Sequence, residues 1–504
     1  MGVIAKQSIK GTIVTYLGVA VGFVTTFFVI TRFLSAEDIG LARVMIDAAT
    51  LFIGLAQLGT SASIMRFYPY FAEPSEVRGQ KPEEHGFFFW TIVVPMVGFL
   101  LVALLFMVCY APLSEWFGEK SPQFVNYYYL VLPLAFFMLY QTVFETNANV
   151  RMRIVFPRAV RELLTRVGLL AVYLLYAFDV VTTDGFVWSL VGVYAVAALC
   201  NTVYLFSLGG VSLKPDFAYL RQNPGIVRKY LLYTAFLVLS AVVSVLAPTL
   251  SSFFITAQMG LSYTGIFAIA TYMAMMVSIP YRSLTAIAAP QLSLAIKHDD
   301  REQISHQLTQ VSGNLLLIGG LILALMWVNI DLIFAILPNG ATYAVARRTV
   351  LLLGIGQLCV ATFQFTVTAL SYSRYYPFTL LFSLVLTVLA LLLNNLFIPR
   401  WGIDGAALAT LTAQVSYYLI ALITVRLALG SRIFTRRHLL TILLLVLLFA
   451  ANALCLRYIP VGTIWLSSLL RTLLVVAVAA LAYQWRISPE INEYIHALFH
   501  RIRL

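Results

Sequence analysis

Long apolar blocks separated by short polar breaks run along the whole chain. A helix that crosses a bilayer needs about 20 mostly apolar residues, and the blocks have about that length. Backbone groups in lipid must pair within the chain, which favours helices, and the weak alternation typical of a barrel is absent. The sequence therefore predicts an all-α polytopic membrane protein with 14 transmembrane helices. The predicted spans cover residues 11–33, 45–67, 87–110, 123–146, 157–179, 185–208, 229–250, 263–289, 309–334, 346–370, 376–398, 404–425, 438–456 and 462–484.

The connections between these blocks are short. The longest, 68–86, 209–228 and 290–308, have about 20 residues, which leaves no room for a soluble domain. The chain starts with an apolar stretch, Gly11 to Thr31, that is too long for a signal peptide, so we expect a retained first span.

Composition supports the same class of protein. The 504 residues are 61% hydrophobic and only 11% charged, about half the charge of a soluble protein, and the mean hydropathy is +0.90. The four cysteines stand far apart in apolar runs without metal or redox spacing, so we expect buried hydrophobes, no metal and no cofactor.

Basic residues alternate between rich and poor connections. When each is assigned to its nearer side, 25 lie on one side and 8 on the other. The positive-inside rule then predicts that both termini are cytoplasmic. The net charge of +12 is thus a topology signal and an attraction to anionic membrane lipids, with no nucleic acid as partner.

The two halves of the chain resemble each other. "FFVITRFLSAEDIG" (27–40) matches "FFITAQMGLSYTG" (253–265), Pro157 matches Pro377, and Asp184-Gly185 matches Asp404-Gly405. Three ordered matches at similar offsets predict two six-helix bundles related by a pseudo-two-fold axis along the membrane normal.

The predicted domains follow from this repeat. Two six-helix bundles cover 1–208 and 222–427, and two extra transmembrane helices lie within 437–484. Residues 487–504 form an amphipathic tail on the cytoplasmic surface or an ordinary packing helix.

A corner in the second half has its own signals. Asp404 is expected to cap a helix and Gly405 to permit the turn, as Asp184 and Gly185 do in the first half. Ala409 and Ala413 continue one small-residue face, which favours close helix packing in lipid over direct substrate contact.

These residues carry a family resemblance over the whole chain. "NNLFIPRWGIDGAALATLTAQ" and "RFLSAEDIGLARVMIDAATLFIGLAQLGTSASIMRFYP" (32–69) resemble segments of the Wzx-type O-antigen flippases. These belong to the multidrug/oligosaccharidyl-lipid/polysaccharide (MOP) exporter superfamily. The resemblance implies a bacterial inner-membrane protein of lipopolysaccharide or other polysaccharide biosynthesis. It implies translocation of polyprenyl-diphosphate-linked oligosaccharide to the periplasmic leaflet by alternating access. It also implies contacts with a polysaccharide polymerase and glycosyltransferases.

Polar residues inside predicted spans are the candidates for a substrate cavity, because charge in a span is unfavourable unless it has a role. Arginine in particular can grip a diphosphate with two hydrogen bonds. The candidates are Arg43, Asp47, Arg66, Gln141, Glu145, Arg166, Arg282 and Gln364.

Each candidate has a structural alternative. Arg66, Arg166 and Arg282 lie close enough to span ends to reach the membrane surface, and Arg43–Asp47 has the spacing of an intrahelical ion pair. Glu145 is either an ion-coupling carboxylate, for Na⁺ or H⁺, or a partner of Arg151 or Arg153. The glutamines bind sugar hydroxyls or join helices.

Other functions remain open. A cation-coupled multidrug exporter has the same shape but tends to carry a carboxylate deep in a first-half span, and a lipid II flippase tends to carry charge in span 1. A membrane glycosyltransferase or polymerase needs catalytic groups in larger loops. No catalytic constellation or nucleotide-binding loop is found, so we expect a protein that is not an enzyme.

Overall fold

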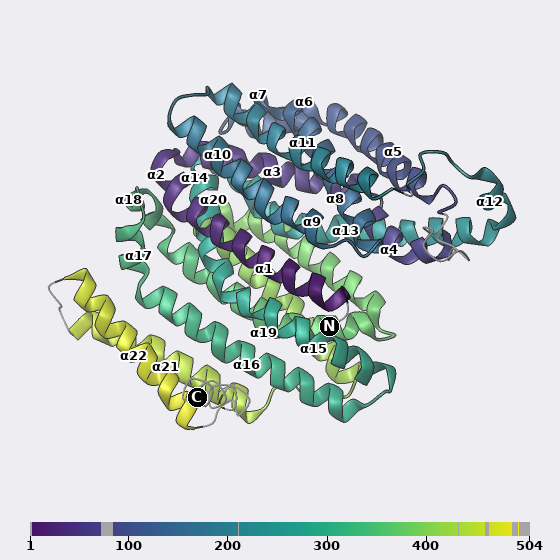
Figure 1. Cartoon of the computed structure of the whole chain (residues 1–504). Coiled ribbons are helices and arrows are strands. Elements are labelled where there is room, and N and C mark those ends of the chain that lie inside the picture. The colour runs from purple at the N-terminus through teal and green to yellow at the C-terminus, as the bar shows by residue number, and fades with distance from the viewer. Residues whose placement is uncertain are drawn as a thin grey trace. The chain divides into compact units, whose positions relative to one another are not determined.

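The computed structural model describes residues 3–71, 84–209, 211–431, 433–458, 463–485 and 492, and the regular elements in these ranges are all helices (Figure 1). In this part of the chain, 11 helical segments are long and apolar enough to cross a membrane. The chain is therefore a multi-pass membrane protein. It divides into two compact units, unit 1 at Met1–Gly265 and unit 2 at Ile266–Leu504.

The helices of the first unit follow the apolar blocks closely. They are α1 Val3–Val24, α2 Thr31–Phe33, α3 Ala36–Ala56, α4 Thr60–Phe71, α5 Phe87–Val108, α6 Tyr110–Gly118, α7 Pro122–Asn126, α8 Val131–Val150, α9 Val155–Ala159, α10 Thr165–Ala177, α11 Thr183–Leu208, α12 Phe217–Gln222 and α13 Pro224–Met259. Two π-helical segments, η1 Thr25–Ile30 and η3 Val160–Leu164, and a 3-10 turn, η2 Tyr128–Leu130, are continuous with them.

The second unit contains longer helices. They are α14 Leu261–Met275 (its first turn lies in unit 1), α15 Ile279–Lys297, α16 Arg301–Val328, α17 Ile330–Ile336, α18 Gly340–Tyr343, α19 Arg347–Tyr372, α20 Tyr376–Ala428, α21 Arg436–Tyr458 and α22 Ile464–Gln484. The 3-10 turns η4 Met276–Ser278 and η5 Ala344–Ala346 connect neighbours.

The second span begins earlier than predicted. Ser35 caps α3, because its hydroxyl accepts the N–H of Asp38 while the Asp38 carboxylate accepts the N–H of Ser35. The helix therefore starts at Ala36 rather than near residue 45, and the predicted boundary was wrong. Hydropathy missed this start because Glu37 and Asp38 in the first turn favour a helix N-terminus but lower the apolar average.

Helices also fill most of the predicted long connections. Only residues 298–300 separate α15 from α16, and α12 and α13 occupy much of 209–228. These connections between apolar blocks are therefore largely helical, since polar helical turns continue beyond the blocks. The predicted tail, 487–504, lies outside the described residues except for Asn492, whose amide donates to the Tyr483 carbonyl at 2.7 Å.

The corner in α20 is made by a different residue from the one predicted. Gly402 has φ 57° and ψ −135°, which breaks the 53-residue helix in two. Asp404 does not cap the second segment: its carboxylate accepts the Thr349 hydroxyl at 2.6 Å. A Cβ on Gly405 would lie 2.2 Å from the Phe397 carbonyl oxygen, so this glycine permits close approach to the preceding segment.

The first-half counterpart shows the same link. Asp184 lies in the first turn of α11, which Thr182 caps, and its carboxylate accepts the Tyr127 hydroxyl at 2.5 Å. The partners are 57 residues apart here and 55 residues apart in the Thr349–Asp404 pair.

Gly40 of α3 and Gly265 of α14, which are matched in the internal repeat, each pack against the helix that carries the other, within unit 1. A Cβ on Gly40 would lie 1.9 Å from the Leu261 carbonyl oxygen, and a Cβ on Gly265 would lie 1.9 Å from the Ala36 carbonyl oxygen. The four positions form a reciprocal pair, so the starts of α3 and α14 cross backbone to backbone. Small residues allow such a crossing where packing drives helix association.

In unit 2, α21 and α22 lie along α16 (Figure 1). Their contact has two apolar layers. One contains Leu317, Leu444 and Ala482, and the next contains Val328, Leu448 and Val475, among others.

The glycine crossing yields a test of the fold. We expect Gly40→Ala to lower stability by about 1–3 kcal/mol, because a methyl group cannot enter a close-packed backbone contact without displacing it. Gly192→Ala is the matched control, since a Cβ added at Gly192 would have nothing within 4 Å, and it should be neutral or stabilise by up to about 1 kcal/mol. Thermal unfolding of the purified protein in detergent measures both. Equal melting temperatures for the two variants would contradict the crossing.

Candidate functional site

Four charged side chains form a continuous row in unit 1, here called the charged ladder: Glu145, Arg161, Glu162 and Arg166. Arg161 donates to Glu145 at 2.9 Å and approaches Glu162 at 3.4 Å. Arg166 donates to Glu162 at 3.0 Å and to the carbonyl of Gly18 on α1 at 3.0 Å. Glu145 is buried and Glu162 is partly buried, with side-chain exposures of 9% and 14%, whereas Arg161 is 50% exposed.

A π-helical turn places the ladder. Arg161 and Glu162 belong to η3, and the Thr165 hydroxyl donates five residues back, to the Val160 carbonyl, at 3.1 Å. Gln141 on α8 donates to the same hydroxyl at 3.3 Å. Such turns re-aim side chains and are frequent at functional sites.

Glycines on α1 leave room for the ladder. A Cβ on Gly18 would lie 2.5 Å from the Glu162 carbonyl oxygen, and one on Gly22 would lie 2.3 Å from Nη1 of Arg166. The first span therefore packs directly against the charged turn.

In the part of the chain that the structure describes, the other charged residues predicted from the sequence, Arg43, Asp47, Arg66 and Arg282, form no ion pair with the ladder. Arg43 and Asp47 form an intrahelical ion pair at 2.8 Å. Arg66 is exposed, with its guanidinium 4.2 Å from the Tyr233 ring centre. Arg282 is an exposed residue of α15 in unit 2.

The two glutamines each connect helices. Gln141 joins α8 to α10 through Thr165, and Gln364 on α19 accepts the Tyr418 hydroxyl of α20 at 2.8 Å. Glu145 pairs with Arg161 and not with Arg151 or Arg153, the partners considered from sequence.

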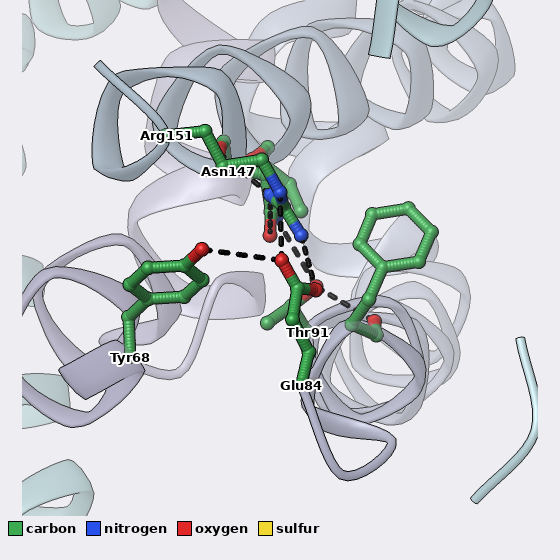
Figure 2. A network of polar contacts seen from close by, with 7 residues as sticks. Tyr68, Glu84, Thr91, Asn147 and Arg151 are labelled. Carbon is green, nitrogen blue, oxygen red and sulfur yellow. Dashed lines mark hydrogen bonds and ion pairs between the residues drawn. The ribbon is translucent and has the colours of Figure 1, made fainter. Parts of the chain in front are cut away.

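Arg151 has another partner, which sequence reasoning missed. Its guanidinium makes two bonds to Glu84, at 2.9 Å and 2.5 Å, and Tyr68 donates to the same carboxylate at 3.2 Å (Figure 2). Arg151 also donates to the Asn147 carbonyl at 2.7 Å, and the Asn147 amide donates to Thr91 at 3.1 Å. This network fixes the start of α5 against the end of α8.

Part of the ladder had a sequence signal. Glu162 and Arg166 stand four residues apart within an apolar block, the spacing of an ion pair on one helix face. Glu84 had none, because it lies in a polar connection 67 residues from Arg151.

The ladder suits an anionic ligand. A guanidinium has five donors, and two carboxylates hold that of Arg161 in place while half of the side chain stays exposed. An incoming phosphate therefore meets a cation that is already oriented.

The fold is that of a multi-pass membrane protein, and comparison with known proteins gives its family. A family model described as polysaccharide biosynthesis protein matches residues 4–293. The chain belongs to this family, and the expected MOP superfamily is confirmed. No curated protein matches the sequence.

Solved structures of this superfamily share the fold. The lipid II flippase MurJ in an inward closed conformation aligns over 94% of this chain and 99% of its own, with TM-score 0.69 and 12% identity. An inward-facing multidrug resistance MATE family transporter covers 81% and 94%, with TM-score 0.64 and 12% identity. A point mutant of the Vibrio cholerae MATE transporter VcmN covers 86% and 99%, with TM-score 0.55 and 15% identity.

The buried Glu84–Arg151 pair yields a stability test. We expect Glu84→Gln to destabilise the protein by about 3–5 kcal/mol, because it leaves a buried cation without its partner. Glu119→Gln is the control. Glu119 is 82% exposed and makes a surface ion pair of 3.5 Å with Lys120, so its substitution should change the free energy of unfolding by no more than about 0.5 kcal/mol. Thermal unfolding in detergent compares them; a Glu84→Gln protein as stable as the control would disprove the anchor.

Proposed function

We propose that this protein is a flippase that moves polyprenyl-diphosphate-linked oligosaccharide from the cytoplasmic to the periplasmic leaflet of a bacterial inner membrane. The observation that carries the proposal is the charged ladder in a chain of the polysaccharide biosynthesis protein family. Alternating access between the two six-helix bundles provides the route. The glycan then serves O-antigen or a related surface polysaccharide, with the polymerase and glycosyltransferases as neighbouring partners.

The proposed topology has 14 spans. The 11 apolar segments become 12 when α20 is divided at Gly402, and α13 and the continuous α9–α10 stretch supply two more. An even number places both termini on one side, and the excess of basic residues assigns that side to the cytoplasm. The reciprocal glycine pair and the two matched hydroxyl–aspartate bonds support a pseudo-two-fold relation between the halves.

The ladder suggests how substrate binding proceeds. A diphosphate carries more negative charge than one carboxylate, so it competes with Glu145 for the exposed guanidinium of Arg161. Once released, Glu145 is a buried carboxylate without its cation, and burial favours either protonation or capture of Na⁺. In this exchange, binding of the substrate diphosphate to Arg161 is coupled to binding of H⁺ or Na⁺ by Glu145.

The alternative substrates differ in charge. A cationic drug needs an unpaired carboxylate, and both carboxylates of the ladder are paired. A peptidoglycan precursor also carries a diphosphate, so the diphosphate alone does not distinguish the two substrates. Lipid II flippases tend to carry charge in span 1, and this chain has none between Gly11 and Thr31, which argues against that substrate.

The exchange yields opposite expectations for the two partners of one ion pair. Arg161→Gln should weaken binding of a short-chain polyprenyl diphosphate carrying one sugar by about tenfold or more, since a charge-assisted contact is lost. Glu145→Gln should tighten binding several-fold, because the competing carboxylate is removed. Binding to the full-length protein in nanodiscs measures both.

Arg400→Gln is the matched control, an exposed arginine outside the ladder, and should bind like the native protein. If both partner variants weaken binding equally while the control does not, the pair is only structural and the exchange is ruled out.

A further inference from the structure

Unit 2 contains a polar cavity between α16 and α21, separate from the charged ladder. Its volume is about 620 Å³. Almost every lining side chain carries a hydroxyl, amide, imidazole or charged group. The lining residues that the argument uses are Glu302, His306, Thr309, Asn314, Arg437 and His438.

The charged residues that line this cavity lie at its exposed rim, and its buried part is lined by uncharged polar groups. Glu302, His306 and Arg437 are exposed, Thr309 and Asn314 are partly buried, and His438 is only 1% exposed. A ligand therefore meets one cation and one anion at the rim and uncharged donors and acceptors inside.

The buried wall is rigid. His438 bonds the Ser312 hydroxyl of α16 at 2.9 Å through one ring nitrogen and the Thr435 hydroxyl at 2.9 Å through the other. The Ser312 bond links the start of α21 to α16, and the Thr435 bond, made at the start of α21, fixes the orientation of the imidazole. This wall of the cavity therefore does not depend on a mobile side chain.

The cavity lies where the polar starts of α16 and α21 give way to their apolar stretches. The uninterrupted apolar run of α16 begins at Leu315, after Asn314, and that of α21 begins at Leu439, after His438, with only Thr441 in its early turns. Directly beyond, α21 exposes Leu439, Leu443 and Leu447 at 62%, 54% and 60%. An amphiphile with its polar end in the cavity would thus place its acyl chains on an apolar surface.

We propose that this cavity binds the headgroup of a phospholipid that carries a primary ammonium, of the phosphatidylethanolamine type. Arg437 receives the phosphate, Glu302 receives the ammonium, and the hydroxyl and amide groups of Thr309 and Asn314 bind the remaining oxygens. The opposite charges of Glu302 and Arg437 at the rim match a zwitterion better than an anionic lipid, which Glu302 would repel. The site is independent of the transported substrate and lies on the side that the basic residues predict to be cytoplasmic.

Native mass spectrometry of the full-length protein in mixed micelles tests this site. Phosphatidylethanolamine, phosphatidylglycerol and phosphatidylcholine of equal chain length compete for it. We expect preferential retention of phosphatidylethanolamine, and Glu302→Gln should reduce its ratio to phosphatidylglycerol about tenfold, because one charge-assisted contact is lost. Arg437→Gln should reduce retention of all three lipids.

Matched controls separate this site from general charge effects. Asp299→Asn and Arg436→Gln remove the same charges from neighbouring positions that do not line the cavity, and both should retain the native preference. Melting temperatures near that of the native protein show that each variant is folded. Soluble glycerophosphoethanolamine at equal concentration should not displace the lipid.

Three results would overturn the site. They are equal retention of the three lipids by the native protein, variants indistinguishable from their controls, and displacement by the soluble headgroup, which would assign the cavity to a water-soluble ligand.

Discussion

A charged side chain within a membrane must have a partner, because hydrocarbon offers no water to solvate it. In unit 1 this constraint joins Glu145, Arg161, Glu162 and Arg166 into one row that ends on the backbone of α1. The row leaves one guanidinium half exposed, so a structure that satisfies the constraint also presents a cation. Burial imposes a similar requirement outside the spans, where Glu84 and Arg151 pair between the start of α5 and the end of α8.

Glycines allow the close backbone contacts that surround the charged ladder. Gly18 and Gly22 let the first span touch the π-helical turn, and Gly40 and Gly265 let two repeated motifs cross. Each motif thus contributes both a helix start and a packing surface. The two motifs, which are similar in sequence, thus meet through the same positions, Gly40 and Gly265.

The sequence predicted the helices and the family well, because hydropathy and span length depend on local composition. It offered Glu145 and Arg166 as candidates but not the bonds that join them. The link passes through Arg161, 16 positions beyond Glu145, across a turn whose π geometry has no local signature. Capping at Ser35 and the turn at Gly402 were missed because a charged first turn and a neighbouring Asp-Gly pair gave stronger local signals. The partner of Glu84 could not be predicted, because Arg151 is 67 residues away in the sequence and meets it only in the folded structure.

The leaflet position of the lipid-linked glycan tests the central claim most directly. Cells depleted of this protein, with no redundant carrier, should accumulate the polyprenyl-diphosphate oligosaccharide where only reagents admitted to the cytoplasm reach it. Restoring the native protein should return the glycan to the periplasmic face, whereas Arg161→Gln should not. Normal periplasmic exposure of the glycan in depleted cells would contradict the account.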